Sequence, residues 1–484
     1  MDKKQLIRQE SMVLNYIYNL LYQVLALIVP LITTPYVARV LQADGVGEYS
    51  YGISITTYFL MFGNLGIATY GQMKIASVRN DDQLRSKIFW EILIARSITM
   101  ALMFGVYLGY ALLISINEEL MIALSLTIFA GLFDITWFLQ GLEKFKTIMI
   151  RNFVIKIASV ILIFTFVNNK DDLIIYALII QGSTLLGNLS IINSARNYLI
   201  KTKLSDFKII PHLKSSMIFF IPSVATSVYT VLDKIMLGGI TNSSLENGYY
   251  DQSLKIVQIA ITIVTSVSTV TLPRMTFLYI NQDTNAMKSI LKNSIQFLLF
   301  ISIPITMGLI LLSNKIIPWF LGSGYDKSIV LLQLLSFLII SMGLNNTIGK
   351  QCLMANGKIK MYNISIICGA LINVVLNIYL IPTLASIGAA TSAVITETFI
   401  LVLFICFSRE WISIKDIVKY SRKYILASLL MGAFLVLFGN SLPNTFINIF
   451  VLIVLGATIY FTILLLTKEE FVVNIIRKAK YQKN

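Results

Sequence analysis

Ten ionisable side chains lie inside long apolar stretches of this 484-residue chain. The cations are Arg39, Arg96, Lys156, Lys234 and Lys255, and the acids are Glu91, Asp134, Asp233, Asp251 and Glu397. An ionised group in apolar surroundings is costly unless it meets water or an opposite charge. The pattern therefore predicts a wet, charged path for a polar substrate.

The remaining chemistry-bearing residues are few. Cys352, Cys368 and Cys406 are widely spaced in or beside apolar runs, which is typical of buried thiols and of neither disulfides nor zinc ligands. His212, the single histidine, lies in a basic segment that we expect to be a loop. We therefore expect no catalytic residue, no metal centre and no cofactor.

The composition explains where the charges must lie. Hydrophobic residues make up 56% of the chain and charged residues 13%, whereas soluble domains carry about 25% charged residues. Since about 20 apolar residues span the hydrocarbon, we predict an all-α polytopic membrane protein of about 14 transmembrane helices. The spans lie near 14–41, 46–70, 88–114, 119–140, 148–167, 173–195, 216–240, 249–273, 293–313, 326–349, 361–381, 384–408, 424–441 and 445–467.

The basic residues set the predicted orientation. Of 39 Lys and Arg residues, 31 fall in the termini and in every second loop. The opposite loops hold only Lys170, Lys315 and Lys327. This asymmetry places both termini in the cytoplasm, and it accounts for the net charge of +15 without nucleic acid.

The depth of each cation suggests its role. Arg39, Lys234 and Lys255 lie within about six residues of a predicted outer end, where a long side chain can reach the interface. Arg96 and Lys156 lie about eight residues from the inner end, roughly 12 Å deep. For these two residues a water-filled interior cavity is the better explanation.

The acids differ in their expected partners. Asp251 and Lys255 are spaced i,i+4, which predicts a local ion pair. Asp233 and Lys234 are adjacent and point apart on a helix, so at least one of them needs another partner. Glu397 lies deep in a span and carries either a proton or a structural hydrogen bond, whereas we expect Glu91 to be solvated near the inner surface.

The order of spans suggests two lobes. We expect an N-terminal lobe at 1–200, a basic cytoplasmic linker at 201–215 and a C-terminal lobe at 216–408, followed by two accessory spans and a basic tail at 409–484. Span 1 ends in YVARVL and turns through ADGVGEYSY, and span 7 ends in VLDKIML and turns through ENGYYDQ. Similar halves with a substrate between them are a common transporter design.

Four segments carry a resemblance to a known family. PLITTPYVARVLQADGVGEYSY (30–51), DITWFLQGLEKFK (134–146), NGYYDQSLKIVQ (247–258) and GALINVVLNIYLIPTLASIGAATSAVITE (369–397) resemble the signatures of Wzx-type polysaccharide flippases. These flippases form the polysaccharide-transporter branch of the multidrug/oligosaccharidyl-lipid/polysaccharide exporter (MOP) superfamily. One departure is Gln42, where the family usually has glycine.

The resemblance implies two six-helix lobes in a V-shape like that of multidrug exporters of the MATE type, with two extra C-terminal helices and alternating access. Arg39 matches the arginine at the end of the family's first helix. Asp134 with Gln140 and Gly141 matches its D-x-x-W-F-x-Q-G motif. In the family a cationic interior accommodates pyrophosphate, and the last two spans can border the lipid tail.

The charges and the resemblance together suggest a flippase of the bacterial cytoplasmic membrane. It would export polyprenyl-pyrophosphate-linked oligosaccharide repeat units to the outer leaflet for surface polysaccharide such as O-antigen or capsule, with polysaccharide polymerase machinery as a candidate partner. We expect the five cations to line the substrate cavity, with Asp134, Asp233 and Glu397 at a gate or in ion coupling. The alternatives are a lipid II-type flippase, a cation-coupled multidrug exporter, which five embedded cations disfavour, and a polysaccharide polymerase, for which the loops are short.

Overall fold

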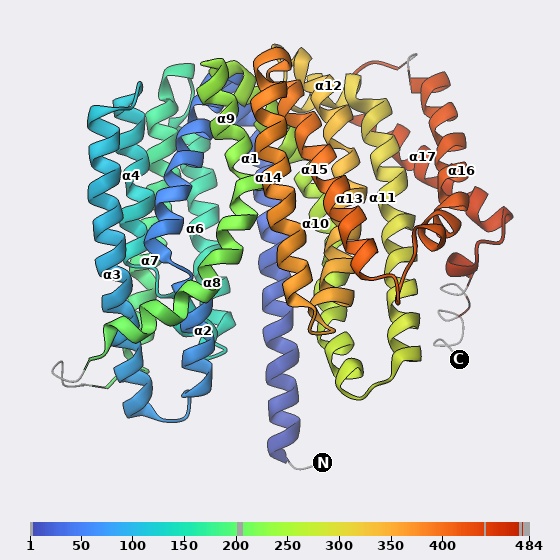
Figure 1. Ribbon diagram of the computed structural model, residues 1–484. Coiled ribbons are helices and arrows are strands. Elements are labelled where there is room, and N and C mark those ends of the chain that lie inside the picture. Colours follow the sequence, from blue (N-terminus) through green and yellow to red (C-terminus); the bar gives the residue numbers. More distant parts are fainter. Residues whose placement is uncertain (1–2, 201–206, 440–441, 474–476, 478–484) are drawn as a thin grey trace. The chain divides into compact units, whose positions relative to one another are not determined.

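The computed structural model describes residues 3–200, 207–439, 442–473 and 477, and every regular element in these ranges is a helix. Figure 1 shows the helices running side by side in long bundles. The first half holds α1 Lys3–Asn64, α2 Ile67–Ser77, α3 Asp82–Leu113, α4 Glu118–Leu132, α5 Thr136–Gly141, α6 Phe145–Phe166 and α7 Leu173–Arg196. The second half holds α8 Ile209–Thr230, α9 Leu232–Thr241, α10 Ser244–Ile280, α11 Thr284–Phe320, α12 Asp326–Leu335, α13 Phe337–Ile348, α14 Ile359–Leu384, α15 Ser386–Phe407, α16 Ile414–Gly439 and α17 Phe446–Leu466.

The chain forms two compact units, which we call lobe 1 (Met1–Ser227) and lobe 2 (Val228–Asn484). The division falls inside α8. The predicted lobe limits at 200 and 216, the linker between them, the separate C-terminal segment and the V-shape stay predictions.

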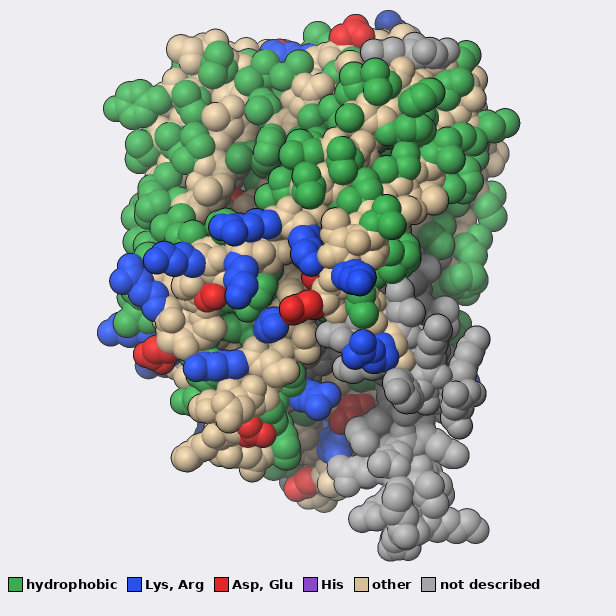
Figure 2. Space-filling view, turned by 90° about the vertical axis from the view of Figure 1, so that its right-hand side faces the viewer, with side chains coloured by type: hydrophobic (Ala, Val, Ile, Leu, Met, Phe, Trp, Pro, Cys, Tyr) green, Lys and Arg blue, Asp and Glu red, His purple; other side chains and the backbone are tan. Residues whose placement is uncertain are grey.

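Ten helical stretches of the described residues are long and apolar enough to cross a membrane. The other four predicted spans fall on the two halves of α1, on α8 with α9, and on α10. The predicted class, an all-α polytopic membrane protein, is therefore confirmed. Figure 2 shows on one face a wide hydrophobic band, with Lys and Arg side chains gathered below it.

The first two spans form one helical element, α1, that is interrupted at a single residue. Gln42 has φ 59° and ψ 178°, so the helix breaks there, where the sequence predicted the turn between spans 1 and 2. This backbone region is populated almost only by glycine and costs about 1–3 kcal/mol for other residues. The family's usual glycine at this position is therefore explained by the geometry.

Gln42→Gly is accordingly expected to raise the free energy of unfolding by about 1 kcal/mol, because relief of backbone strain exceeds the entropy cost of glycine. Thermal and denaturant unfolding in detergent would measure it. Gln72→Gly, inside α2, is the matched control and should destabilise by about 1 kcal/mol. Equal losses at both positions would contradict strain at Gln42.

Two of the described membrane-spanning stretches, Glu118–Gly141 and Asp326–Met354, contain irregular turns. α4 and α5 are separated at Phe133–Ile135, and α12 and α13 at Ser336. The end of α13 continues as a π-helical turn, Gly349–Met354, in which Gln351 Nε2 donates to Thr271 Oγ1 at 2.5 Å and to Ser294 Oγ at 3.3 Å. Irregular backbone inside a membrane is tolerated where protein groups satisfy it, and it is often functional.

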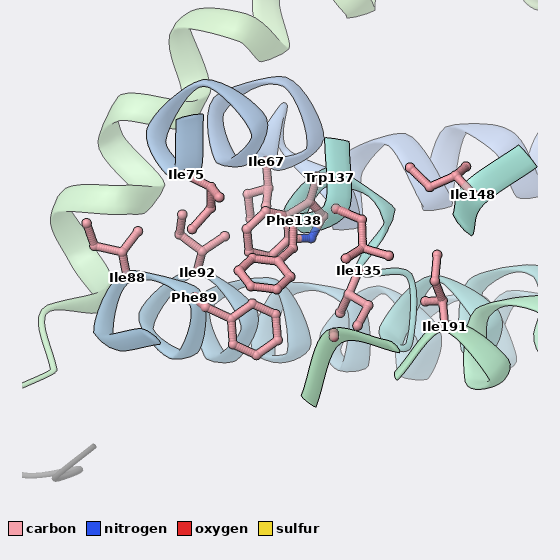
Figure 3. Packing of buried hydrophobic residues seen from close by; sticks show 12 residues of the cluster. Ile67, Ile75, Ile88, Phe89, Ile92, Ile135, Trp137, Phe138, Ile148 and Ile191 are labelled. Carbon is pink, nitrogen blue, oxygen red and sulfur yellow. The ribbon is translucent and has the colours of Figure 1, made fainter. Parts of the chain in front are cut away.

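A buried hydrophobic cluster holds α2 and α5 against α3 in lobe 1. Figure 3 shows Ile67 and Ile75 from α2 facing Phe89 and Ile92 from α3, with Trp137 between them. A Cβ on Gly71 would approach the Trp137 ring to 2.6 Å, so glycine is needed for this contact. The cluster fixes the short helix that follows Asp134.

Candidate functional site

A cavity of about 310 Å³ whose lining includes several charged side chains lies within lobe 2, among membrane-spanning helices. It brings together Lys234, Lys255 and Glu397, three of the residues predicted from the sequence, and adds Asp251. Its full lining is Lys234, Tyr250, Asp251, Leu254, Lys255, Gln258, Leu338, Met342, Asn373, Ala393, Thr396 and Glu397.

Two lysines share one buried carboxylate in this cavity. Lys234 Nζ lies 2.5 Å from Asp251 Oδ1, and Lys255 Nζ lies 2.7 Å from Asp251 Oδ2. The predicted i,i+4 ion pair between Asp251 and Lys255 is confirmed. Lys234, which cannot pair with the adjacent Asp233, pairs with Asp251, 17 residues later in the chain. Since two ammonium groups face one carboxylate, the trio carries an excess positive charge.

Asp233, adjacent to Lys234, is bonded elsewhere. Its carboxylate accepts hydrogen bonds from the Tyr250 hydroxyl at 3.0 Å and from Asn377 Nδ2 at 2.6 Å. Asn377 in turn donates to Asn373 Oδ1 at 3.2 Å, and Asn373 lines the cavity. The buried Asp233 is thus linked to the cavity through amides.

Glu397 makes a structural hydrogen bond, one of the two alternatives left open by the sequence, and its role as a proton carrier stays a prediction. It lines the cavity, and its carboxylate accepts a hydrogen bond from Asn345 Nδ2 at 2.7 Å. The same amide also donates to the Glu397 carbonyl at 2.9 Å. The carboxyl offsets the excess charge of the lysine–aspartate trio only when it is ionised.

In lobe 1, Arg96 and Asp134 meet at the break between α4 and α5. Arg96 is 2% exposed, and its guanidinium donates to the Asp134 carbonyl at 2.6 Å and to the Asp134 carboxylate at 3.2 Å. Asp134 Oδ1 accepts a hydrogen bond at 3.0 Å from the N–H of Thr136, the first residue of α5. The pair therefore neutralises two of the predicted site charges and shapes the broken helix.

A second arginine, which the sequence analysis did not single out, contacts the same turn. Arg151 on α6 donates to Asn188 Oδ1 at 3.0 Å and to Thr136 Oγ1 at 3.4 Å. Asn188 Nδ2 in turn donates a hydrogen bond to the Ala130 carbonyl at 2.9 Å. The pattern Thr-x₁₄-Arg on neighbouring helices leaves no sequence signal, because the helices meet only on folding.

Two predictions about Glu91 and His212 are wrong. Glu91 is 4% exposed, and His212 is buried in α8 instead of lying in a loop. Nε2 of His212 lies 2.8 Å from Glu91 Oε2, and Nδ1 lies 2.7 Å from the Tyr70 hydroxyl. The Lys208 N–H also donates to Glu91 at 2.8 Å, so the start of α8 is tied to α3 and α2.

The remaining predicted cations lie apart from these contacts. Arg39 is exposed on α1 near the Gln42 break, and Lys156 is half-buried on α6. Lys350, half-buried in the π-helical turn near the end of an apolar stretch, is a further cation that sequence analysis did not single out. Among the described residues no three His, Cys, Asp or Glu side chains gather in a way that could hold a metal ion.

Each of the two predicted turns carries a glutamate that contacts the start of another helix. Glu48 accepts from Asn117 Nδ2 at 2.9 Å, where Asn117 caps α4. Glu246, before the predicted eighth span, accepts from Lys327 Nζ at 2.7 Å and from the Ser386 N–H and hydroxyl at 3.0 and 2.5 Å. The two glutamates occupy different positions in the similar sequences, since Glu48 follows Gly47 and Glu246 precedes Gly248, so these contacts do not extend the internal echo.

Burial alone would raise the pKa of Glu246, but hydrogen bonds from Lys327 and Ser386 outweigh it and hold the pKa below its usual range. This contact therefore stabilises lobe 2 above about pH 4.3, the ordinary glutamate value, and is lost as pH falls through the depressed pKa. Thermal unfolding between pH 3 and 7 should show a steeper acid loss in wild type than in Glu246→Gln. Parallel curves would contradict the assignment.

Comparisons with known proteins place this arrangement in a family. Proteins named "Putative O-antigen transporter" from Escherichia coli (strain K12) and Shigella dysenteriae are 23% and 26% identical over 403 and 381 residues. The matches cover 82% and 78% of this chain and 96% and 94% of those proteins. A "Probable low-salt glycan biosynthesis flippase" of Haloferax volcanii is 24% identical over 53% of this chain and 55% of its own length.

Solved structures share the fold. "Lipid II flippase MurJ, inward closed conformation" superposes with a TM-score of 0.76 at 20% identity, covering 96% of this chain and all of that one. A "multidrug resistance MATE family transporter of the MOP superfamily" in an inward-facing conformation gives 0.63 at 13% identity, over 81% and 96% of the two chains. The family described as "Polysaccharide biosynthesis protein" matches residues 12–279. The chain therefore belongs to the polysaccharide biosynthesis protein family, within a fold shared by MOP exporters.

Proposed function

We propose that this protein is a flippase for polyprenyl-pyrophosphate-linked oligosaccharides, which it moves from the cytoplasmic to the outer leaflet of a bacterial cell membrane by alternating access. The observation that carries the proposal is the lysine–aspartate trio at a cavity within the spans. Pyrophosphate is anionic, and a charged path through hydrocarbon must be polar and lined by opposite charge. Family membership and the names of the relatives support the same substrate class.

Charge decides the roles that we assign. Lys234 and Lys255 contact the pyrophosphate in lobe 2, and Arg39, Arg96 and Lys156 supply positive charge along the path. Arg96 forms an ion pair with Asp134 in this structure. Its positive charge therefore becomes available to the substrate only when that ion pair breaks. Asp134, Asp233 and Glu397 serve as gate or ion-coupling groups, and both termini lie in the cytoplasm.

The membrane potential can drive this export. Carrying two negative charges out of a negative cytoplasm gains about 4.6 kcal/mol per 100 mV. The chemistry is transport without a covalent step, with no catalytic residue or cofactor. A polysaccharide polymerase would act next on the exported units.

Reconstituted vesicles test the proposal. A short, labelled polyprenyl-pyrophosphate sugar should cross the bilayer in the presence of the protein, faster when the potential favours anion movement. Lys255→Gln should slow transport about tenfold or more, and Lys255→Arg, which keeps the charge, should retain most of it. Lys358→Gln, whose partner is the exposed Glu410, is the control and should transport as wild type does.

Three outcomes would overturn the proposal. Wild-type transport by both Arg96→Ala and Lys156→Ala at normal expression would remove the cationic path. Flux of organic cations in place of the lipid-linked sugar would favour a multidrug exporter. Preference for lipid II over other glycan carriers would favour the lipid II-type alternative.

A further inference from the structure

A groove of about 600 Å³ lies on lobe 1, and none of the residues assigned above to the substrate is among its lining residues. Its walls come from α3, from the break between α4 and α5, and from the C-terminal end of α7. The side chains are aromatic and aliphatic, and the rim residues Trp90 and Ile200 are 37% and 41% exposed. The groove therefore presents a concave apolar surface to the outside of the lobe.

The polar side chains among the groove's lining residues are Ser97 and Arg196, and no carboxylate is among them. Arg196 is exposed at the end of α7. A second cation lies beside that end, since Lys144 Nζ lies 5.2 Å from the centre of the Tyr198 ring. Arg85 also donates to the Tyr198 carbonyl at 2.6 Å, but it is buried and its charge is paired with Asp82 at 2.8 Å. One end of the groove is thus cationic and the rest is apolar.

The dimensions and orientation suit one leaflet of a bilayer. Trp90 and Ser97 are seven residues apart on α3, or about 10 Å along its axis, and half of the hydrocarbon core is about 15 Å thick. The distribution of Lys and Arg predicts that the Arg196 end faces the cytoplasm. Tryptophan and arginine at this level are typical of the interface, and the cytoplasmic leaflet carries the anionic lipids.

We propose that this groove binds an anionic phospholipid of the cytoplasmic leaflet. The phosphate group lies beside Arg196, and one acyl chain follows α3 past Trp90 toward Ser97. Phe133 and Ile135, which line the groove, flank Asp134 in the broken helix. The bound acyl chain therefore packs against the turn that contacts Arg96. In this proposal the lipid is a structural ligand and is not transported.

Lipid-dependent unfolding of the purified full-length protein tests this binding. In neutral detergent, added phosphatidylglycerol should raise the Tm more than phosphatidylcholine of the same chain length. Arg196→Gln should weaken the apparent affinity for phosphatidylglycerol about fivefold, the equivalent of about 1 kcal/mol for one cation near an anionic headgroup. Arg422→Gln, an exposed cation of α16, is the matched control and should leave the affinity unchanged.

A second variant tests the apolar part of the groove. Ser97→Phe fills the groove and should abolish the Tm increase by phosphatidylglycerol. Unchanged affinity in Arg196→Gln would overturn the proposal, and so would tighter binding of undecaprenyl phosphate than of phosphatidylglycerol, which would assign the groove to the carrier lipid. Because the readout is lipid binding, these outcomes are independent of whether the protein transports a lipid-linked sugar.

Discussion

Replacement of Asp251 by asparagine is expected to lower the free energy of unfolding by about 3–5 kcal/mol. The Asp251 carboxylate holds both Lys234 and Lys255, and Lys234 has only 18% of its side chain exposed. Removing one partner of a buried ion pair leaves an uncompensated charge, which costs far more than the intact pair contributes. Denaturant unfolding in detergent, followed by tryptophan fluorescence, would measure the loss.

The double variant Asp251→Asn with Lys234→Met is the control for this prediction. It removes the more buried of the two unpaired charges and keeps the side-chain volume, so it should recover more than half of the lost stability. Lys255→Met alone should cost less, because the Lys255 side chain is 39% exposed and the other lysine still pairs. A loss below about 1 kcal/mol in Asp251→Asn would show that water solvates both ammonium groups. The two ion pairs would then contribute little to the stability of the cavity.

His212→Ala is expected to cost about 2–4 kcal/mol and to loosen the start of α8. The variant removes the imidazole from both of its partners, the buried Glu91 carboxylate, which keeps the hydrogen bond from the Lys208 N–H, and the Tyr70 hydroxyl. A buried carboxylate that loses a partner pays its desolvation penalty. Hydrogen exchange over residues 209–216 should speed up, and the unfolding midpoint should fall.

A double-mutant cycle separates the Glu91–His212 contact from general damage. Glu91→Gln, His212→Ala and the double variant should give a coupling energy above about 1 kcal/mol. Lys214→Ala, which removes an exposed cation from the same helix, should change neither stability nor exchange. Additive losses in the cycle would mean that the two side chains stabilise the lobe separately.

The sequence predicted those features that depend on local pattern. Apolar runs located the spans because each one must cover the same thickness of hydrocarbon. The Asp251–Lys255 pair followed from helical spacing, and the break in α1 falls at Gln42, where the predicted turn lies. These features depend on neighbours within one or two turns of helix.

Contacts between distant helices were beyond the sequence. Lys234 reaches Asp251 from another helix, and Glu91 meets His212 across 121 residues. A basic segment with one histidine is typical of a cytoplasmic loop, so the burial of His212 in α8 had no signal in composition. Arg151 and Lys350 were missed because they lie near the ends of apolar runs, where a loop and a buried turn look alike.

The π-helical turn at Gly349–Met354 has a consequence for how one helix can serve two sites. An α-helix advances 100° per residue, whereas the wider turn advances less, so residues beyond it are rotated out of phase with those before it. Asn345, before the turn, faces Glu397 on α15, and Gln351, within it, faces Thr271 on α10 and Ser294 on α11. Deletion of one residue within 349–354 would restore the α-helical rotation per residue and turn one of these amides away from its hydrogen-bond partner. The π-helical turn therefore sets the rotation between the two polar faces of this helix.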